Sequence, residues 1–274
     1  MRSPFAVVLA LATALALSFL ILPIVAIFVE IPPGRLLDGM NDPAAVDALL
    51  VTLKTTLIAN VLILVVGTPA AYLIATRSFR GKPLLVTAVE LPLVLPPAVA
   101  GIGLLAAFGR AGLLGSAVRF LGIEIAFTQI AVVLAVMFVA SPFYLRAAIS
   151  AFESVDPSLT GAARTLGAGP ARTFFRIALP LAGGGLGAGW ALSFARGIGE
   201  FGATIMFAGS LQGVTQTLSL AVYEQFDVEF DVALAIGAEL VVVSALLLLA
   251  VKLVPTWTRS NSPSTTLSAP FGSR

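Results

Sequence analysis

Few residues of this chain could take part in chemistry. Neither His nor Cys occurs among its 274 residues, which removes the commonest general base, the commonest metal ligand and every thiolate. Three carboxylates stand in largely apolar surroundings but in separate segments: Glu90, Glu200 and Glu239. A buried charge in such a setting indicates either a functional site or a structural ion pair. No metal site and no catalytic residue is predicted.

Arg196 and Glu200 stand four residues apart, which places them on one face of a helix if the helix continues through both. Because a lone charge in a bilayer is costly, we expect them to pair or to face water. Two interpretations stay open. With Phe201, the pair either shapes a gate near the outer end of a transport path or only locks the helix bundle. Glu200 would repel a dianion, so a high-affinity anion site is not expected.

Prolines and glycines mark where helices break or approach each other. Pro92, Pro96 and Pro97 interrupt an apolar run and free backbone carbonyls, so they either line a cavity or hinge, or form a static kink. The glycines between 183 and 189 predict close helix packing, either within the bundle or across a dimer. The glycines between 197 and 202 lack the Lys-Ser/Thr of a phosphate loop, so nucleotide binding is not predicted there.

The elements that carry these residues are membrane spans. The chain is 58% hydrophobic and 11% charged, with a mean hydropathy of +1.03, far outside the range of soluble domains. A span needs roughly 20 mostly apolar residues. The sequence predicts six: Phe5–Val29, Leu53–Ala75, Leu84–Phe108, Ile125–Tyr144, Ile177–Phe194 (with a continuation towards Ala208) and Val232–Val254. The first is interpreted as a retained span, since its apolar run is too long for a signal peptide.

Basic residues predict the orientation. Six spans place both termini on one side, which then holds eleven Lys and Arg residues: Arg2, Arg77, Arg80, Lys82, Arg146, Arg164, Arg172, Arg176, Lys252, Arg259 and Arg274. The opposite side holds four: Arg35, Lys54, Arg110 and Arg119. The positive-inside rule therefore predicts cytoplasmic termini. Residues 1–258 are expected to form one transmembrane domain, and residues 259–274 a disordered tail.

The loop between the fourth and fifth spans, about residues 150–176, contains residues that are typical of helix starts and helix ends. Asp156 followed by Pro157 is typical of a helix start, and Gly167 of a helix end. Leu159, Ala163 and Leu166 lie at helical spacing between them. A second short helix is expected from Pro170. The pattern predicts a short helix across the membrane face, which either docks into a partner or rests on its own bundle.

This loop resembles the cytoplasmic signature of ABC importer permeases. That signature reads Glu-Ala-Ala, three residues, Gly, nine residues, Ile, one residue, Leu-Pro, and here Ala162-Ala163, Gly167, Ile177 and Leu179-Pro180 match its spacing. Gly161 stands where the family usually has Glu, which removes one polar contact. The resemblance implies docking to a nucleotide-binding subunit through six residues: Ala162, Ala163, Arg164, Leu166, Gly167 and Ala168.

Two further stretches resemble the oxyanion-importing permeases of this family. They are Leu91-Pro-Leu-Val-Leu-Pro-Pro-Ala-Val-Ala-Gly101 and Arg196-Gly-Ile-Gly-Glu-Phe-Gly-Ala-Thr-Ile-Met-Phe-Ala-Gly209. The second, followed by Thr215-Gln-Thr-Leu218, is closest to the molybdate type. The resemblance covers roughly residues 50–250. It implies a transport path or gate that includes Pro96, Pro97, Arg196, Glu200 and Phe201.

The resemblance thus implies an all-α permease subunit of the type I importer fold that imports molybdate, with tungstate as an alternative, by alternating access. Its implied partners are a second copy of itself, two ATPase subunits that bind and hydrolyse ATP, and an extracytoplasmic molybdate-binding protein. No nucleic-acid partner and no cofactor of its own are expected. The expected location is the inner or plasma membrane.

Three alternatives stay open. A sulfate permease subunit would share most of these motifs. An ion-coupled secondary transporter or channel would have no use for the coupling loop. An intramembrane enzyme would need a carboxylate pair or a serine–lysine dyad, yet the lysines lie at span ends: Lys54, Lys82 and Lys252.

Overall fold

The described part of the chain, residues 4–259 of the computed structural model, is built from helices and contains no strand; side chains are described up to residue 250. Five helices are long: α1 (Pro4–Glu30), α3 (Pro43–Thr76), α7 (Gln129–Glu153), α10 (Leu179–Ile198) and α13 (Phe230–Arg259). The shorter helices are α2 (Pro33–Met40), α4 (Lys82–Val94), α5 (Pro97–Phe108), α6 (Gly115–Phe120), α8 (Pro157–Thr165), α9 (Pro170–Thr173), α11 (Gly202–Ala208) and α12 (Leu218–Phe226), and a π-helical turn, η1, covers Phe174–Ala178.

The six predicted spans are recovered, with altered boundaries. Five helices are long and apolar enough to cross a membrane, and α4 with α5 makes a sixth if that bent pair counts as one span. Two starting points predicted from hydropathy are wrong. The second span begins ten residues early because Asp42 accepts a hydrogen bond from the Ala44 N–H and Pro43 opens the helix. The fourth begins at Gln129, after the capping residue Thr128.

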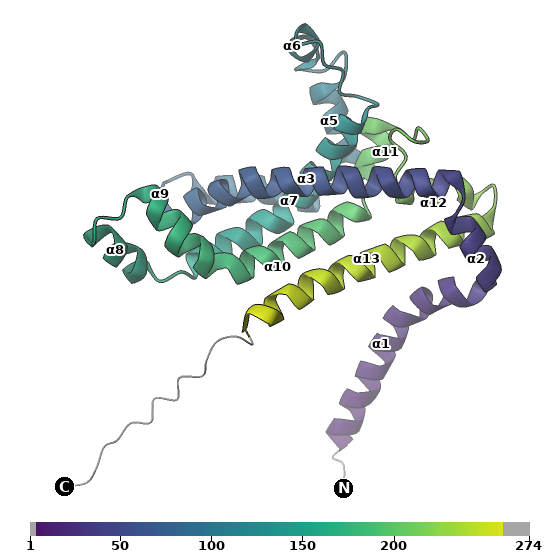
Figure 1. Cartoon of the computed structure of the whole chain (residues 1–274), viewed down its shortest axis with the longest axis horizontal. Helices are drawn as coiled ribbons and strands as arrows, with labels where there is room; N and C mark the ends of the chain where they lie inside the picture. The colour runs from purple at the N-terminus through teal and green to yellow at the C-terminus, as the bar shows by residue number, and fades with distance from the viewer. Residues whose placement is uncertain (1–3, 260–274) are drawn as a thin grey trace.

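The third predicted span is two helices rather than one kinked helix. Its axis turns by 114° between α4 and α5, at the break that Leu95 and Pro96 form. Figure 1 shows the result: α5 and α6 stand away from the bundle of α3, α7, α10 and α13 instead of running along it. The proline cluster therefore redirects the chain by more than a kink, and its role as a cavity lining or hinge stays a prediction.

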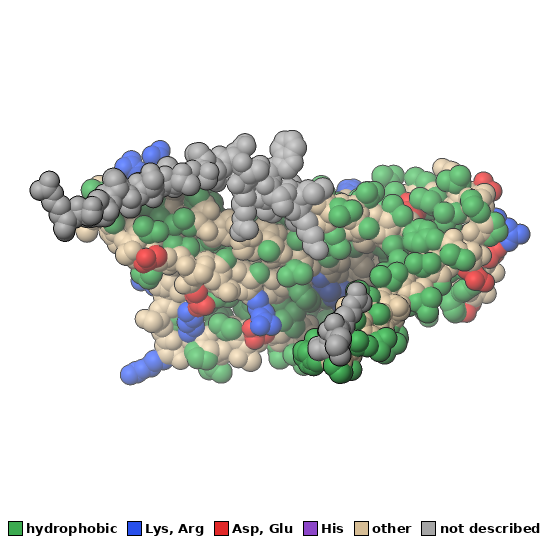
Figure 2. Space-filling view, turned by 90° about the horizontal axis from the view of Figure 1, so that it is seen from below, with side chains coloured by type: hydrophobic (Ala, Val, Ile, Leu, Met, Phe, Trp, Pro, Cys, Tyr) green, Lys and Arg blue, Asp and Glu red, His purple; other side chains and the backbone are tan. Residues whose placement is uncertain are grey.

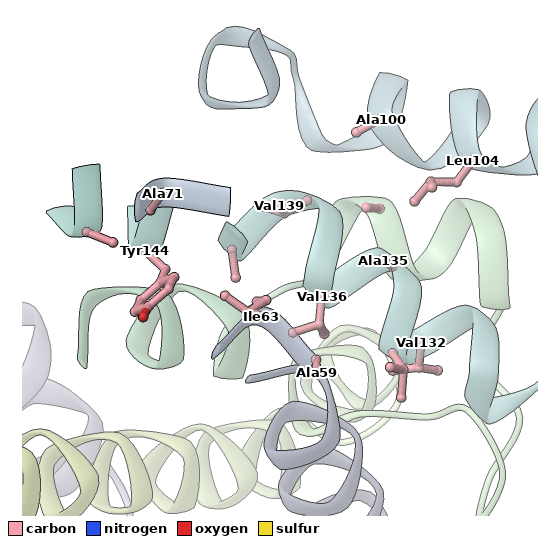
Figure 3. Packing of buried hydrophobic residues seen from close by; sticks show 14 of the residues in the cluster. Ala59, Ile63, Ala71, Ala100, Leu104, Val132, Ala135, Val136, Val139 and Tyr144 are labelled. Atoms are coloured by element: carbon pink, nitrogen blue, oxygen red, sulfur yellow. The ribbon is translucent and has the colours of Figure 1, made fainter. Parts of the chain in front are cut away.

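The core lies where α3, α7 and α10 pack together. Figure 3 shows its small and branched side chains, among them Ala59, Ile63, Val136 and Val139, with Tyr144 at one side of the cluster. The Tyr144 hydroxyl lies 2.5 Å from Thr68 Oγ1, so this buried polar group is paired.

Two glycines of α10 allow its close approach to α7. A Cβ added at Gly185 would meet Ala151 Cβ at 2.5 Å, and one at Gly189 would meet Ala147 Cβ at 2.6 Å. The prediction of close packing is confirmed for these two positions. Gly183, Gly184 and Gly187 face open space in the single chain, so they do not serve packing within the bundle, and their packing across a dimer stays a prediction.

Helix α1 diverges from the rest of the molecule (Figure 1) and buries none of its described side chains. It carries apolar residues all round. A helix of this kind is stable where lipid or another apolar surface surrounds it. Figure 2 shows a face on which apolar side chains are widespread, with acidic and basic side chains over its left part and at its right-hand end.

Candidate functional site

The predicted coupling loop is a small, well-capped structure. Asp156 Oδ1 accepts a hydrogen bond of 2.8 Å from the Ser158 N–H and opens α8. This backbone hydrogen bond, followed by one from the Ser158 side chain, lowers the pKa of the Asp156 carboxyl below its ordinary value. At the other end, Gly167 has a φ of +80°. The Gly167 N–H bonds the Arg164 carbonyl, and the Ala168 N–H bonds the Ala163 carbonyl, which is a Schellman cap.

The cap determines which of the predicted coupling residues point outward. Ala163 is buried, whereas Leu166, next to the Schellman glycine, is 88% exposed. Ala162, Arg164 and Gly167 are exposed and Ala168 is half-buried. The structure therefore brings five of the six residues to one accessible tip. The contact of these six residues with a partner stays a prediction.

Gly161 lies open at the same loop. A Cβ there would meet nothing within 4 Å. The residue lines a hollow of about 390 Å³ that Thr160, Arg164 and the ends of α3 and α7 also line. The position where the resembled family usually has Glu is thus an unfilled notch beside an arginine.

An aromatic cluster joins this loop to the bundle, and sequence reasoning missed it. The ring centroids of Tyr72 and Phe174 are 4.8 Å apart, and those of Tyr72 and Phe152 are 5.2 Å apart. The three rings come from α3, α7 and η1, so the π-helical turn that follows α9 is held against two other helices. No sequence signal identified the contact, because the three residues are far apart along the chain.

The second predicted site is a crossing of two broken helices. The predicted continuation of the fifth span towards Ala208 is wrong: α10 ends at Ile198, and α11 begins anew at Gly202. A Cβ added at Gly202 would lie 2.8 Å from Pro97 Cβ, and one at Gly101 would lie 2.6 Å from the Ala203 carbonyl oxygen. The start of α5 therefore packs directly on the start of α11, which brings Pro96 and Pro97 near the Glu200–Phe201 break.

The Arg196–Glu200 pair forms although the helix ends between the two residues. Arg196 Nη2 lies 2.7 Å from Glu200 Oε2, and the side chains are 29% and 1% exposed. Glu200 Oε1 accepts the Ala203 N–H at 2.7 Å, at the start of α11. The carboxylate therefore balances a cation on α10 and orders the first turn of α11, where a negative charge also favours the helix dipole.

The same break holds α12. Ser219 Oγ donates to the Glu200 carbonyl at 3.0 Å, and the rings of Phe201 and Tyr223 lie 5.1 Å apart. Neither Ser219 nor Tyr223 was predicted. Residues 199–201 are thus a junction at which α10, α11 and α12 are tied together, so a displacement of α10 is passed to both.

Buried polar side chains extend from this junction along α3. Thr52, Thr56 and Asn60 follow one another at intervals of four residues and are buried. Thr52 Oγ1 accepts the Leu218 N–H at 2.8 Å, which anchors the start of α12. The four-residue spacing of these polar residues is visible in the sequence. Their contact with the start of α12 could not be predicted from it.

The other two carboxylates have different surroundings. Glu90, isolated in the sequence, pairs with Arg146 (Oε1 to Nε, 3.0 Å). Glu239 is buried in α13, and its Oε2 has no hydrogen-bond partner in the part of the chain described here. The same residues contain no group of three or more acidic side chains that could hold a metal ion.

Fold and site together define a class: a multi-pass, all-helical membrane protein built like the permease subunits of ABC transporters. A solved bacterial ABC transporter that imports the acidic polysaccharide alginate aligns with a TM-score of 0.76 and 15% identity, over 95% of this chain and 97% of that one. Residues 63–259 match the profile of the "binding-protein-dependent transport system inner membrane component" family, and the chain belongs to that family.

Among characterised members of this family, the chain is similar to permeases named for molybdenum transport. The molybdenum transport system permease protein ModB of Mycobacterium bovis is 42% identical over 233 residues, 85% of this chain and 88% of the relative. ModB of Escherichia coli K12 is 44% identical over 178 residues, 65% of this chain and 78% of the relative.

Proposed function

We propose that this chain is the membrane-spanning permease subunit of an ATP-driven importer of molybdate, with tungstate as the alternative cargo. The observation that carries the proposal is the 42% identity, over most of both chains, to a permease named for molybdenum transport. The family and the fold support transport through a bundle of this kind.

The proposed assembly contains two copies of this chain, two ATPase subunits that bind ATP, and an extracytoplasmic molybdate-binding protein. The α8–α9 tip supports the ATPase contact, because Leu166 and Leu159 are exposed there on a rigidly capped loop. An exposed apolar side chain on a short helix fits a groove in a partner. The open position Gly161 leaves room beside Arg164 for a polar side chain of the ATPase.

The orientation follows from the distribution of basic residues. We propose that the α8 end is cytoplasmic, that both termini lie on that side, and that the membrane is the inner or plasma membrane. The binding protein would then deliver its anion at the opposite end, where α2 and α12 lie (Figure 1).

The contacts of the structure suggest how movement passes through the subunit. ATP-driven closure of the ATPase subunits displaces α8 and α9. Because Tyr72, Phe152 and Phe174 pack together, η1 carries that displacement to α10. At the far end of α10, the Arg196–Glu200 pair moves the start of α11 against α5. A change at one membrane face would thereby open or close the crossing.

The proposal is tested by uptake of labelled molybdate in cells that lack this chain, with sulfate and tungstate as competitors. We expect uptake to collapse, to return with the intact gene, and to be competed by tungstate but not by sulfate. Unchanged molybdate uptake together with reduced sulfate uptake would instead identify a sulfate permease subunit.

A second measurement separates the ATP-driven mechanism from an ion-coupled one. Gentle solubilisation with affinity capture of this chain should bring down an ATPase subunit in equal amount. Capture of the chain alone, combined with uptake that a protonophore abolishes and ATP depletion does not, would favour a secondary transporter.

A further inference from the structure

Helix α4 is joined to the bundle mainly by charges. It packs against α7 but buries none of its own side chains. Two ion pairs connect the two helices: Lys82 Nζ lies 3.0 Å from Glu153 Oε1, and Glu90 pairs with Arg146 further along α4. Because so little surface is buried, the position of α4 on α7 depends strongly on these two contacts.

The carboxylate of Glu153 also borders a second cation. Of the residues that line the hollow of about 390 Å³ beside α8, two are charged: Glu153 at the end of α7 and Arg164 in the last turn of α8. Gly161 lines the same hollow without a side chain to separate them. Among the described side chains, Arg164 has no ion-pair or hydrogen-bond partner. One cation therefore holds Glu153, and another stands unpaired at the edge of the same open space.

The hydroxyl groups of this hollow do not compete for the carboxylate. The Thr160 and Thr76 hydroxyls donate to carbonyls of their own helices, at 3.0 and 2.7 Å. A hydroxyl has a single proton to donate, so neither can donate to Glu153 at the same time. Arg164 is the group lining the hollow that can replace Lys82.

The Lys82–Glu153 pair is suited to breaking. Its side chains are 28% and 48% exposed, and exposed pairs add little stability. An arginine can bind a carboxylate through two parallel hydrogen bonds, whereas a lysine binds it as a point charge. A displacement of α8 that brings Arg164 up to Glu153 therefore replaces the first pair by a stronger one, and leaves Lys82 to water.

We propose that Glu153 is a positioning residue that changes partner during transport. It holds Lys82, and with it α4, in the arrangement of this structure, and it takes Arg164 when α8 moves. The proposal rests on the proposed ATP-driven displacement of α8. Helix α4 leads through the turn of 114° to α5, whose start packs on α11. The exchange of partners thus gives the crossing a second connection with the coupling loop, separate from the one through α10.

Charge reversal distinguishes an exchange from a static pair. Lys82→Glu with Glu153→Lys restores the first pair with reversed signs, but its new lysine repels Arg164. Adding Arg164→Glu makes both pairings attractive again. The matched control adds Arg172→Glu to the double swap instead, because Arg172 is exposed in the same loop and does not line the hollow. Molybdate import per ATP hydrolysed is measured in vesicles, together with the amount of ATPase subunit that each variant captures.

We expect the double swap to import about threefold less molybdate per ATP than the parent, or lower still. The triple variant with Arg164→Glu should recover most of the loss, and the one with Arg172→Glu should not. Full recovery in the double swap would identify a static pair and overturn the proposal. So would a triple variant that captures the ATPase normally and stays uncoupled.

A distance measurement decides independently of how Arg164 contacts the ATPase. Spin labels are placed at Leu84→Cys on α4 and Ser150→Cys on α7, which are both exposed in a chain without cysteine. We expect their separation in the assembled transporter to increase with a non-hydrolysable ATP analogue, and not to respond once Glu153→Gln is added. An unchanged separation in the labelled parent would overturn the proposal. Import by the unlabelled parent in the same vesicles judges the proposed function separately.

Discussion

Gly167 is the single residue on which the shape of the coupling loop depends most. Its φ of +80° lies in the left-handed region, and a Cβ there would meet no neighbour. A substitution therefore strains the backbone without disturbing any packing. A β-branched side chain in this conformation costs about 1–3 kcal/mol, enough to open the Schellman cap. We predict that Gly167→Val leaves the protein folded in the membrane but uncouples ATP hydrolysis from molybdate uptake.

The matched control for that variant is Gly169→Val. Gly169 lies two residues away and also faces open space, but its φ is −66°, which any residue adopts. Uptake and ATPase activity, measured in vesicles, should stay near those of the parent protein. Equal damage from both substitutions would show that bulk at the loop, rather than the cap, causes the loss.

Asp156 makes the start of α8 sensitive to pH. Its hydrogen bonds from Ser158 lower the carboxyl pKa in the folded state. The capping contribution is therefore fully present above the pKa of an unfolded Asp and is lost as the pH falls through the lowered value. We predict that hydrogen-exchange protection of residues 157–166 declines in acid. Asp156→Asn keeps an acceptor and does not titrate, so its protection should not change over the same interval.

The Arg196–Glu200 pair is a test of charge balance inside the bundle. Arg196→Ala leaves a carboxylate that is 1% exposed without its cation, and removing one partner of a buried pair costs about 3–5 kcal/mol. We predict loss of uptake and a lower yield of folded protein. Adding Glu200→Gln removes the stranded charge, and the amide oxygen still accepts the Ala203 N–H, so the double variant should recover folding. Full activity of Arg196→Ala alone would deny the pair any role.

Sequence reasoning was most successful where a residue acts on its immediate neighbours. Asp156, Gly167 and the Arg196–Glu200 spacing were identifiable because each contact spans four residues or fewer. Tyr72, Phe152 and Phe174 form one cluster from three helices, and the sequence contains no periodicity that relates them. The same limit applies to Ser219, whose partner, the carbonyl of Glu200, is a backbone atom.

At the scale of the elements, the contact between α5 and α11, where the two broken helices cross, can be tested by substitution. Gly101 and Gly103 lie two residues apart on α5. A Cβ at Gly101 would lie 2.6 Å from the Ala203 carbonyl oxygen, while one at Gly103 meets nothing within 4 Å. Overpacking of this kind costs about 1–3 kcal/mol. We predict that Gly101→Ala lowers the thermal unfolding midpoint and impairs uptake, and that Gly103→Ala changes neither.

If both alanine variants unfold at the parent temperature, the helices can separate without cost and the crossing is not a rigid contact. If both unfold early, the effect comes from α5 itself. The experiment uses the whole chain in detergent. Each of the two substitutions adds one methyl group to α5.

The existence of these helices could be predicted from hydropathy. The bends and breaks between them could not. Each long helix matches an apolar run, since lipid leaves a helix as the only way to pair every backbone group. The turn of 114° at Pro96 and the restart at Gly202 depend on how α5 and α11 pack against each other. A hydropathy profile contains no term for that contact. The prolines therefore predicted an interruption of the third span but not its angle, and the fifth span was expected to continue towards Ala208.

At the scale of the whole molecule, the orientation in the membrane is the property most open to a direct test. The chain contains no cysteine, so a single introduced thiol reports one position. Leu166 lies in the α8–α9 turn, and Val228 lies between α12 and α13. Both side chains are exposed, and the two turns lie at opposite ends of the bundle. We predict that a membrane-impermeant maleimide labels Val228→Cys in intact cells and labels Leu166→Cys only after permeabilisation.

The prediction depends on the number of Lys and Arg residues on each side of the membrane, eleven on the predicted cytoplasmic side against four on the other, and not on any packing contact. It is therefore independent of the crossing between α5 and α11. Labelling of Leu166→Cys in intact cells would place the coupling loop outside, where no ATP-driven partner could reach it, and the ATP-driven import mechanism would fail with it. Protection of Leu166→Cys with exposure of Val228→Cys would fix the direction in which a movement of α8 must travel: from the cytoplasmic face, through η1 and α10, to the junction at Glu200.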